Sequence, residues 1–117
     1  MQLKLYGKKI WVYRQAIDFR CAIDGLVGLI SNELKQKPQE DIYIFYNRHN
    51  DRIKCLSWHK NGFILLYKRL EKGKFCFRHN KATGVMEINV TELSWLLAGL
   101  EWQKMRYWHE LNYDKFT

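Results

Sequence analysis

The pair Asn61-Gly62 constrains the fold of this chain more than any other short feature. It lies between two segments rich in β-branched and aromatic residues, 52–59 (RIKCLSWH) and 63–69 (FILLYKR). Asn-Gly is the strongest short-range signal for a tight turn between antiparallel strands, because both residues tolerate positive backbone φ angles. The two segments are therefore expected to form a β-hairpin.

Further strand-like segments lie on both sides of this hairpin. They are 10–13 (IWVY), 42–46 (IYIFY), 75–77 (FCF) and 85–90 (VMEINV). Their β-branched and aromatic composition suits strands, and turn residues such as Lys72-Gly73-Lys74 separate neighbours. The pattern predicts an antiparallel β-meander of about five to six strands.

Two segments have helical spacing instead. The first is expected to begin at 18–21 and to end before Pro38, with apolar residues at Ile23, Leu26, Val27, Ile30 and Leu34. The second begins at Thr91 as the N-cap and carries Leu93, Leu96, Leu97 and Leu100. Helices at either end of a run of antiparallel strands predict an α+β domain with both helices packed on one face of the sheet.

Length and composition favour one globular domain. A chain of 117 residues has room for a single core, and 47% hydrophobic residues with one proline are atypical of disorder. The expected domain spans 1–117, and 103–117 form an aromatic C-terminal extension that is too apolar for a solvated tail.

The cysteines and apolar runs bear on location. Three cysteines are an odd, widely spaced set, and no apolar signal segment follows Met1, so we expect a reduced, cytoplasmic protein. The longest apolar runs, 42–46 and 63–67, are far shorter than the roughly 20 residues of a membrane span. No membrane association is expected.

Positive charge is concentrated in one part of the chain. Residues 47–78 hold nine of the twenty Lys and Arg but two of the twelve Asp and Glu, within a chain of net charge +8. A basic, aromatic-interleaved block on a near-neutral scaffold is typical of a nucleic-acid binder, because Lys and Arg neutralise phosphates and rings stack on bases. The predicted DNA contacts are Arg48, Arg52, Lys54, Lys68, Arg69, Lys72, Lys74 and Arg78.

The same Lys and Arg residues could instead form a solvated sheet face or protect an edge strand. Strand alternation places Arg52 and Lys54 on one face, whereas Lys68 lies on the face opposite to its neighbour Arg69. Because both faces cannot bind one partner, some of these Lys and Arg residues are not expected to contact DNA.

Metal binding and catalysis have weaker signals. Cys55, His59, Cys76 and His79 are potential zinc ligands, but their spacing is not that of a zinc finger or ribbon. No spacing among the acids resembles a set that binds catalytic magnesium, and no Gly-rich phosphate loop joins a strand to a helix. We expect no metal, no cofactor and no enzymatic activity.

Several motifs in order resemble a known family. They are 24–26 (DGL), 51–54 (DRIK) leading to Trp58, 68–75 (KRLEKGKF) and 96–102 (LLAGLEW). Over about 10–102 the chain resembles the small accessory proteins called TnpB, the second open reading frame of insertion-sequence family 66, which are distinct from the RNA-guided nuclease of that name. The matching motifs contain Arg52, Lys54, Lys68, Arg69, Lys72 and Lys74.

The resemblance implies participation in transposition beside a separate transposase that carries the catalytic acids. With the basic block, it suggests a non-enzymatic accessory factor that binds DNA, most simply duplex DNA. The alternatives are an RNA-binding module, or a protein adaptor that docks on the transposase through Trp102, Trp108 and Tyr113, since aromatic residues are frequent interface anchors.

Overall fold

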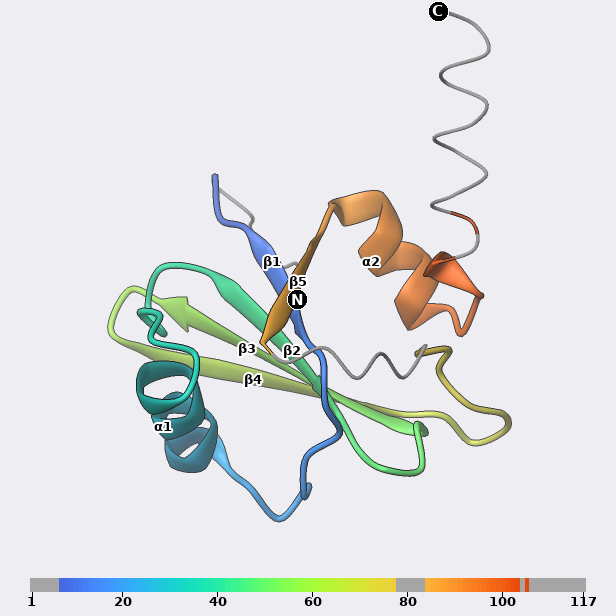
Figure 1. The fold of residues 1–117 in the computed structure, drawn as a ribbon, viewed down its shortest axis with the longest axis horizontal. Helices are drawn as coiled ribbons and strands as arrows, with labels where there is room; N and C mark the ends of the chain where they lie inside the picture. Colours follow the sequence, from blue (N-terminus) through green and yellow to red (C-terminus); the bar gives the residue numbers. More distant parts are fainter. Residues whose placement is uncertain (1–6, 78–83, 104, 106–117) are drawn as a thin grey trace, which may run out of the picture.

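The protein folds as a five-stranded mixed sheet with one helix on each face (Figure 1). The structure is a computed structural model and describes residues 7–77, 84–103 and 105. Most strand pairs are antiparallel, so the predicted α+β class is confirmed. Two details of the predicted arrangement, the sheet order and the position of the helices, are wrong.

The central part of the sheet is the predicted meander. Strands β2 (Ile42–Tyr46), β3 (Arg52–His59) and β4 (Gly62–Arg69) pair antiparallel in sequence order. The hairpin between β3 and β4 is confirmed, with His59 paired to Gly62 and a positive φ of 52° at Lys60 in the loop. The Asn-Gly signal thus located the turn, and Gly62 is already the first residue of β4.

The outer strands do not continue this meander. The sheet order is β4-β3-β2-β1-β5, in which β1 (Ile10–Tyr13) runs parallel to β2 and antiparallel to β5 (Val85–Ile88). The chain between β4 and β5 therefore crosses to the far edge of the sheet. The predicted strand 75–77 is irregular, although Phe75 is buried and its backbone N–H donates to the Asn50 carbonyl at 2.6 Å.

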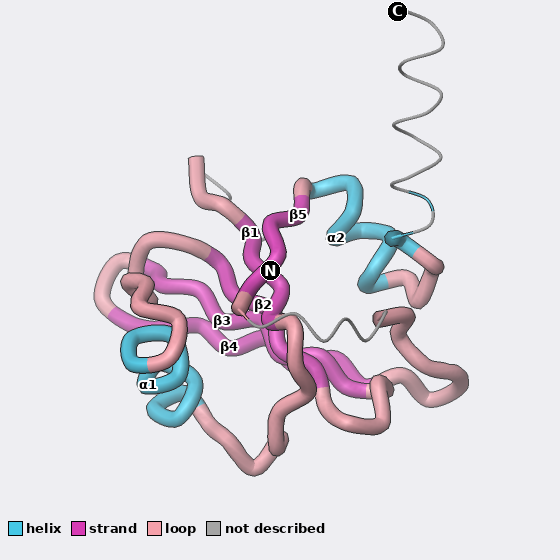
Figure 2. Tube along the Cα trace, in the orientation of Figure 1, coloured by secondary structure: helices cyan, strands magenta, loops and turns pink. Residues whose placement is uncertain are grey.

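The helices cover opposite faces of the sheet, as the tube in Figure 2 also shows. Helix α1 (Ile23–Asn32) buries Leu26 and Ile30 against one face, and α2 (Val90–Leu97) buries Leu93 and Leu96 against the other. The physical reason is β2, in which all five residues are buried. A strand that is apolar at every position needs cover on both faces, whereas an alternating strand needs cover on one.

The helix ends also differ from the prediction. Asn89, not Thr91, caps α2: its side chain accepts from the Glu92 backbone N–H at 2.8 Å, and the Glu92 carboxylate accepts from the Asn89 N–H at 3.1 Å. Helix α1 begins at Ile23, later than expected, and ends at Asn32. Residues 16–21 are consequently a loop, and this loop forms one wall of the cleft described next.

Candidate nucleic-acid interface

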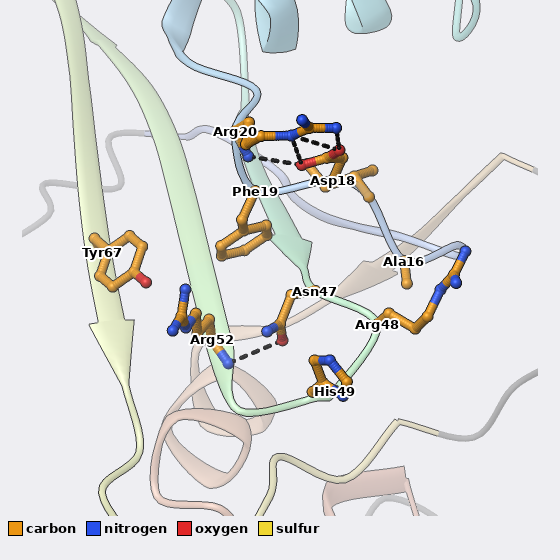
Figure 3. A pocket seen from close by; sticks show the side chains of 10 residues that line it. Ala16, Asp18, Phe19, Arg20, Asn47, Arg48, His49, Arg52 and Tyr67 are labelled. Atoms are coloured by element: carbon orange, nitrogen blue, oxygen red, sulfur yellow. Dashed lines mark hydrogen bonds and ion pairs between the residues drawn. The ribbon is translucent and has the colours of Figure 1, made fainter.

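A cleft of about 560 Å³ opens between the loop after β1, the turn between β2 and β3, and the nearby ends of β3 and β4 (Figure 3). It is on the α1 face of the sheet. Tyr67 and Arg52 lie on the same face of the strands as Leu56, and Leu56 packs in the core with Leu26 of α1. The lining residues are Ala16, Ile17, Asp18, Phe19, Arg20, Asn47, Arg48, His49, Arg52 and Tyr67.

The β2–β3 turn is fixed by the side chain of Asn47. Its Oδ1 accepts from the backbone N–H groups of Asp51 and Arg52, both at 3.1 Å, and its Nδ2 donates to Asp51 Oδ1 at 2.6 Å. Asn side chains stabilise turns in this way because they replace a missing backbone partner. Arg48 and His49 are thereby held, exposed, at the tip of the turn.

The opposite wall contains an exposed ion pair. Arg20 Nη2 lies 2.6 Å from Asp18 Oδ2, and the Arg20 backbone N–H donates to Asp18 Oδ1 at 2.9 Å. The side-chain hydrogen bond from Arg20 is the main reason that the pKa of Asp18 is lowered to about 2. Asp18 is the only acid among the lining residues, and its charge is balanced by Arg20.

Arg52 has an unpaired donor that is enclosed beside the cleft. Its Nε is buried and has no hydrogen-bond partner among the residues that the structure describes. A guanidinium group carries five N–H donors, and leaving one buried without an acceptor is unfavourable. The Arg52 guanidinium group is therefore incompletely satisfied within the fold.

Two aromatic rings border the cleft beside Arg52. Phe19 and Tyr67 are in contact, with ring centroids 6.0 Å apart and a tilt of 59° between the planes. Tyr67 is 51% exposed and is one of the exposed large apolar side chains among the described residues. The site therefore combines a basic lining with an exposed ring, the two features that nucleic-acid surfaces share.

The eight predicted DNA contacts separate into different environments. Arg48 and Arg52 line the cleft, and Arg69 lies beside it, directly opposite Arg52 in the β3–β4 ladder. Lys72 and Lys74 are exposed on the segment after β4, away from the cleft lining. Arg78 lies outside the described residues.

Two of the eight donate hydrogen bonds to backbone carbonyls of the protein itself. Lys54 is 6% exposed, and its Nζ donates to the Phe19 and Cys21 carbonyls at 2.8 and 2.7 Å, so its predicted role as a DNA contact is corrected to that of a brace for the 16–21 loop. Lys68 is exposed but on the α2 face, and its Nζ donates to the Leu97 carbonyl at 2.6 Å. The alternation of side chains along a strand correctly predicted that Lys68 and Arg69 lie on opposite faces of the sheet.

Of the three predicted partner-docking residues, Trp102 is buried and the other two are not described. Trp102 is 1% exposed, packs near Phe77 and donates its Nε1–H to the Cys76 carbonyl at 2.7 Å. Its assignment to docking is therefore corrected: a partner cannot reach this ring in the folded protein. Trp108 and Tyr113 lie outside the described residues.

Sequence reasoning missed Phe19, Arg20, His49 and Tyr67 as members of the site. Tyr67 and His49 lie within the basic block, so the interleaving of aromatic and basic residues was the signal that could have found them. Phe19 and Arg20 had no such signal, because the predicted helix began at 18–21 and would have placed them on it.

The described residues offer little support for metal or thiol chemistry. No group of three or more His, Cys, Asp or Glu that could hold a metal ion occurs in them. Burial raises the pKa of the Cys55 thiol to about 12, which makes it a poor nucleophile, and His79 is not described. No helix within the described ranges is long and apolar enough to cross a membrane.

Comparison with known proteins gives the chain a family context. The model of the IS66 Orf2-like protein family matches residues 8–107. The uncharacterized protein y4jC of Sinorhizobium fredii (strain NBRC 101917 / NGR234) is 39% identical over 101 residues, covering 86% of each chain. The uncharacterized protein y4hO of the same strain is 27% identical over 96 residues, covering 81% of this chain and 83% of its own. No solved structure matches significantly.

Proposed function

The chain belongs to the IS66 Orf2-like protein family, and we propose that it is a non-enzymatic accessory factor for transposition that binds duplex DNA. The family implies the accessory role in transposition. DNA binding is inferred from the charge and geometry of this chain, and the cleft at the β2–β3 turn is its proposed centre.

One observation carries the proposal: three arginines gather at one end of the sheet. Arg48 and Arg52 line the cleft, and Arg69 lies opposite Arg52 on the same face. Phosphate groups along a DNA backbone attract such clusters, and arginine binds phosphate oxygens through two parallel N–H donors.

A salt titration of binding to a blunt DNA duplex tests the proposal. The logarithm of the affinity should fall with the logarithm of the salt concentration by about 0.9 for each phosphate contacted. Arg48→Gln should weaken binding and reduce this slope by about 0.9. The absence of binding at low salt would reject the proposal, and competition with RNA would identify an RNA-binding module instead.

Lys37→Gln is the matched control. It also removes one positive charge, but Lys37 is highly exposed and precedes β2, at the opposite end of that strand from the cleft. A general electrostatic effect would reduce the affinity of both variants equally. A localised interface requires the loss to be larger for Arg48→Gln.

A second candidate function is an adaptor that docks on the transposase. A largely apolar groove of about 170 Å³ lies between the sheet and α2, lined by Ile44, Ile53, Cys55, Leu66, Tyr67, Lys68, Leu93 and Leu97. Val90 and Leu100, at 56% and 43% exposure, add apolar surface near α2. Exposed apolar surface favours protein contacts.

Co-purification with the transposase of the same element tests this second function. Deleting residues 106–117, which contain Trp108 and Tyr113, should abolish the association if these residues dock. An unchanged association would exclude the extension as the docking element, and DNA binding at the cleft should persist in either case.

A further inference from the structure

We propose that the cleft holds one unpaired nucleotide, whose base stacks on Tyr67 and whose phosphate binds Arg52. The protein would then prefer DNA with a single-stranded end to a continuous duplex. This inference rests on the proposed DNA-binding function and assigns a substrate form to the same site.

The size of the cleft supports a single nucleotide. Its volume of about 560 Å³ is within the usual range of roughly 300–1,000 Å³ for sites that enclose a small molecule. Bases of a continuous duplex remain stacked inside the helix and must leave it to enter such a pocket. An unpaired base at a DNA end has already lost most of this stacking.

Tyr67 has the properties of a stacking platform. Half of its surface is exposed, while the tilted contact with Phe19 restrains the ring. Phe19 is itself held, because Lys54 Nζ lies 4.8 Å from its ring centroid and bonds to its carbonyl. The platform is therefore ordered before any base arrives, which lowers the entropic cost of binding.

Phosphate recognition would come from the same side of the cleft. Tyr67 pairs with Lys54 in the ladder, and Arg52 is two residues from Lys54 on the same face, so Tyr67 and Arg52 are diagonal neighbours. Figure 3 shows Phe19, Tyr67 and Arg52 at one part of the cleft and Arg48 with His49 at another. A base on Tyr67 would thus have its phosphate near Arg52, and Arg48 would lie along the following backbone.

The test compares three fluorescent DNA hairpins with the same stem. One has a blunt end, one carries a short overhang of unpaired thymidines, and one carries an abasic overhang of equal length and charge. Wild-type protein should bind the thymidine overhang roughly fivefold or more tightly than the abasic one, the effect of one stacked base. Tyr67→Leu should bind the thymidine and abasic overhangs with equal affinity, whereas Tyr67→Phe should retain the gain.

Each other outcome is decisive. Equal affinities for the thymidine and abasic overhangs, or a gain that persists in Tyr67→Leu, would overturn the nucleotide site. If the blunt hairpin binds with the expected salt dependence but no overhang binds better, the nucleotide site fails and duplex binding stands. If no hairpin binds, both proposals fail. Thermal unfolding of Tyr67→Leu establishes that the variant is folded.

Discussion

Arg52 of β3 and Arg69 of β4 lie directly opposite each other in the antiparallel ladder and project from the same face of the sheet. Like charges in this position repel, and the only ion pair that either makes among the described residues is the one between Arg69 and Glu71, at 3.0 Å. The arrangement is unfavourable for the isolated fold. A negatively charged ligand would relieve it.

The first prediction separates stability from binding at this pair. Arg52→Gln should raise the free energy of unfolding by about 0.2–1 kcal/mol, because it removes the repulsion with Arg69. The same substitution should weaken DNA binding severalfold. Urea unfolding and a binding titration on the same sample measure the two effects, and a loss of stability greater than about 1 kcal/mol would contradict the proposed repulsion.

The second prediction concerns the buried Lys54. Lys54→Met preserves the length of the side chain but removes both donors to the Phe19 and Cys21 carbonyls. We expect the free energy of unfolding to fall by about 2 kcal/mol, because two partly buried carbonyls lose their partners. Urea unfolding measures the change.

Lys68→Met is the control for this experiment. Lys68 also donates to a carbonyl, that of Leu97, but it is exposed and water can replace the bond. Its substitution should cost less than about 1 kcal/mol. Equal costs for Lys54→Met and Lys68→Met would show that Lys54 does not brace the loop.

The third prediction distinguishes the observed cap of α2 from the one expected from sequence. Asn89→Ala breaks the capping box and should destabilise the protein by about 1 kcal/mol, whereas Thr91→Ala should change stability by a few tenths of that amount. Thermal unfolding of the two variants decides between the positions. A larger effect at Thr91 would place the cap there.

The fourth prediction uses the thiol of Cys55. Burial raises its pKa from 9.0 to about 12, so the folded protein binds this proton more tightly than the unfolded chain does. The resulting contribution to stability is complete below pH 9 and is lost as the pH rises from 9 toward 12, because only the unfolded chain releases the proton readily.

Comparing Cys55→Ala with the unsubstituted protein measures this contribution. The decline in unfolding free energy above pH 9 should be shallower in the variant, since it lacks the thiol. In a Cys21→Ser, Cys76→Ser background, a thiol reagent should label Cys55 only after unfolding. Rapid labelling of the native protein would contradict its burial.

The sequence determined the local features, each of which depends on residues close together in the chain. The hairpin at Asn61-Gly62, the strand 42–46 and the opposite sides of Lys68 and Arg69 all follow from turn chemistry and the two-residue period of a strand. The family motifs, too, are properties of the linear chain. The continuous apolar run 42–46 also requires cover on both faces of the sheet, which the two helices provide.

The tertiary structure alone decided the strand order and the role of each basic side chain. No local pattern states that β5 pairs with β1, because that pairing depends on contacts between distant segments. Arg52 and Lys54 are the same kind of residue on the same face of one strand, yet the 16–21 loop covers Lys54 and leaves Arg52 at the cleft. Burial by a remote segment, which composition and periodicity do not encode, determines whether a cation braces the fold or faces a ligand.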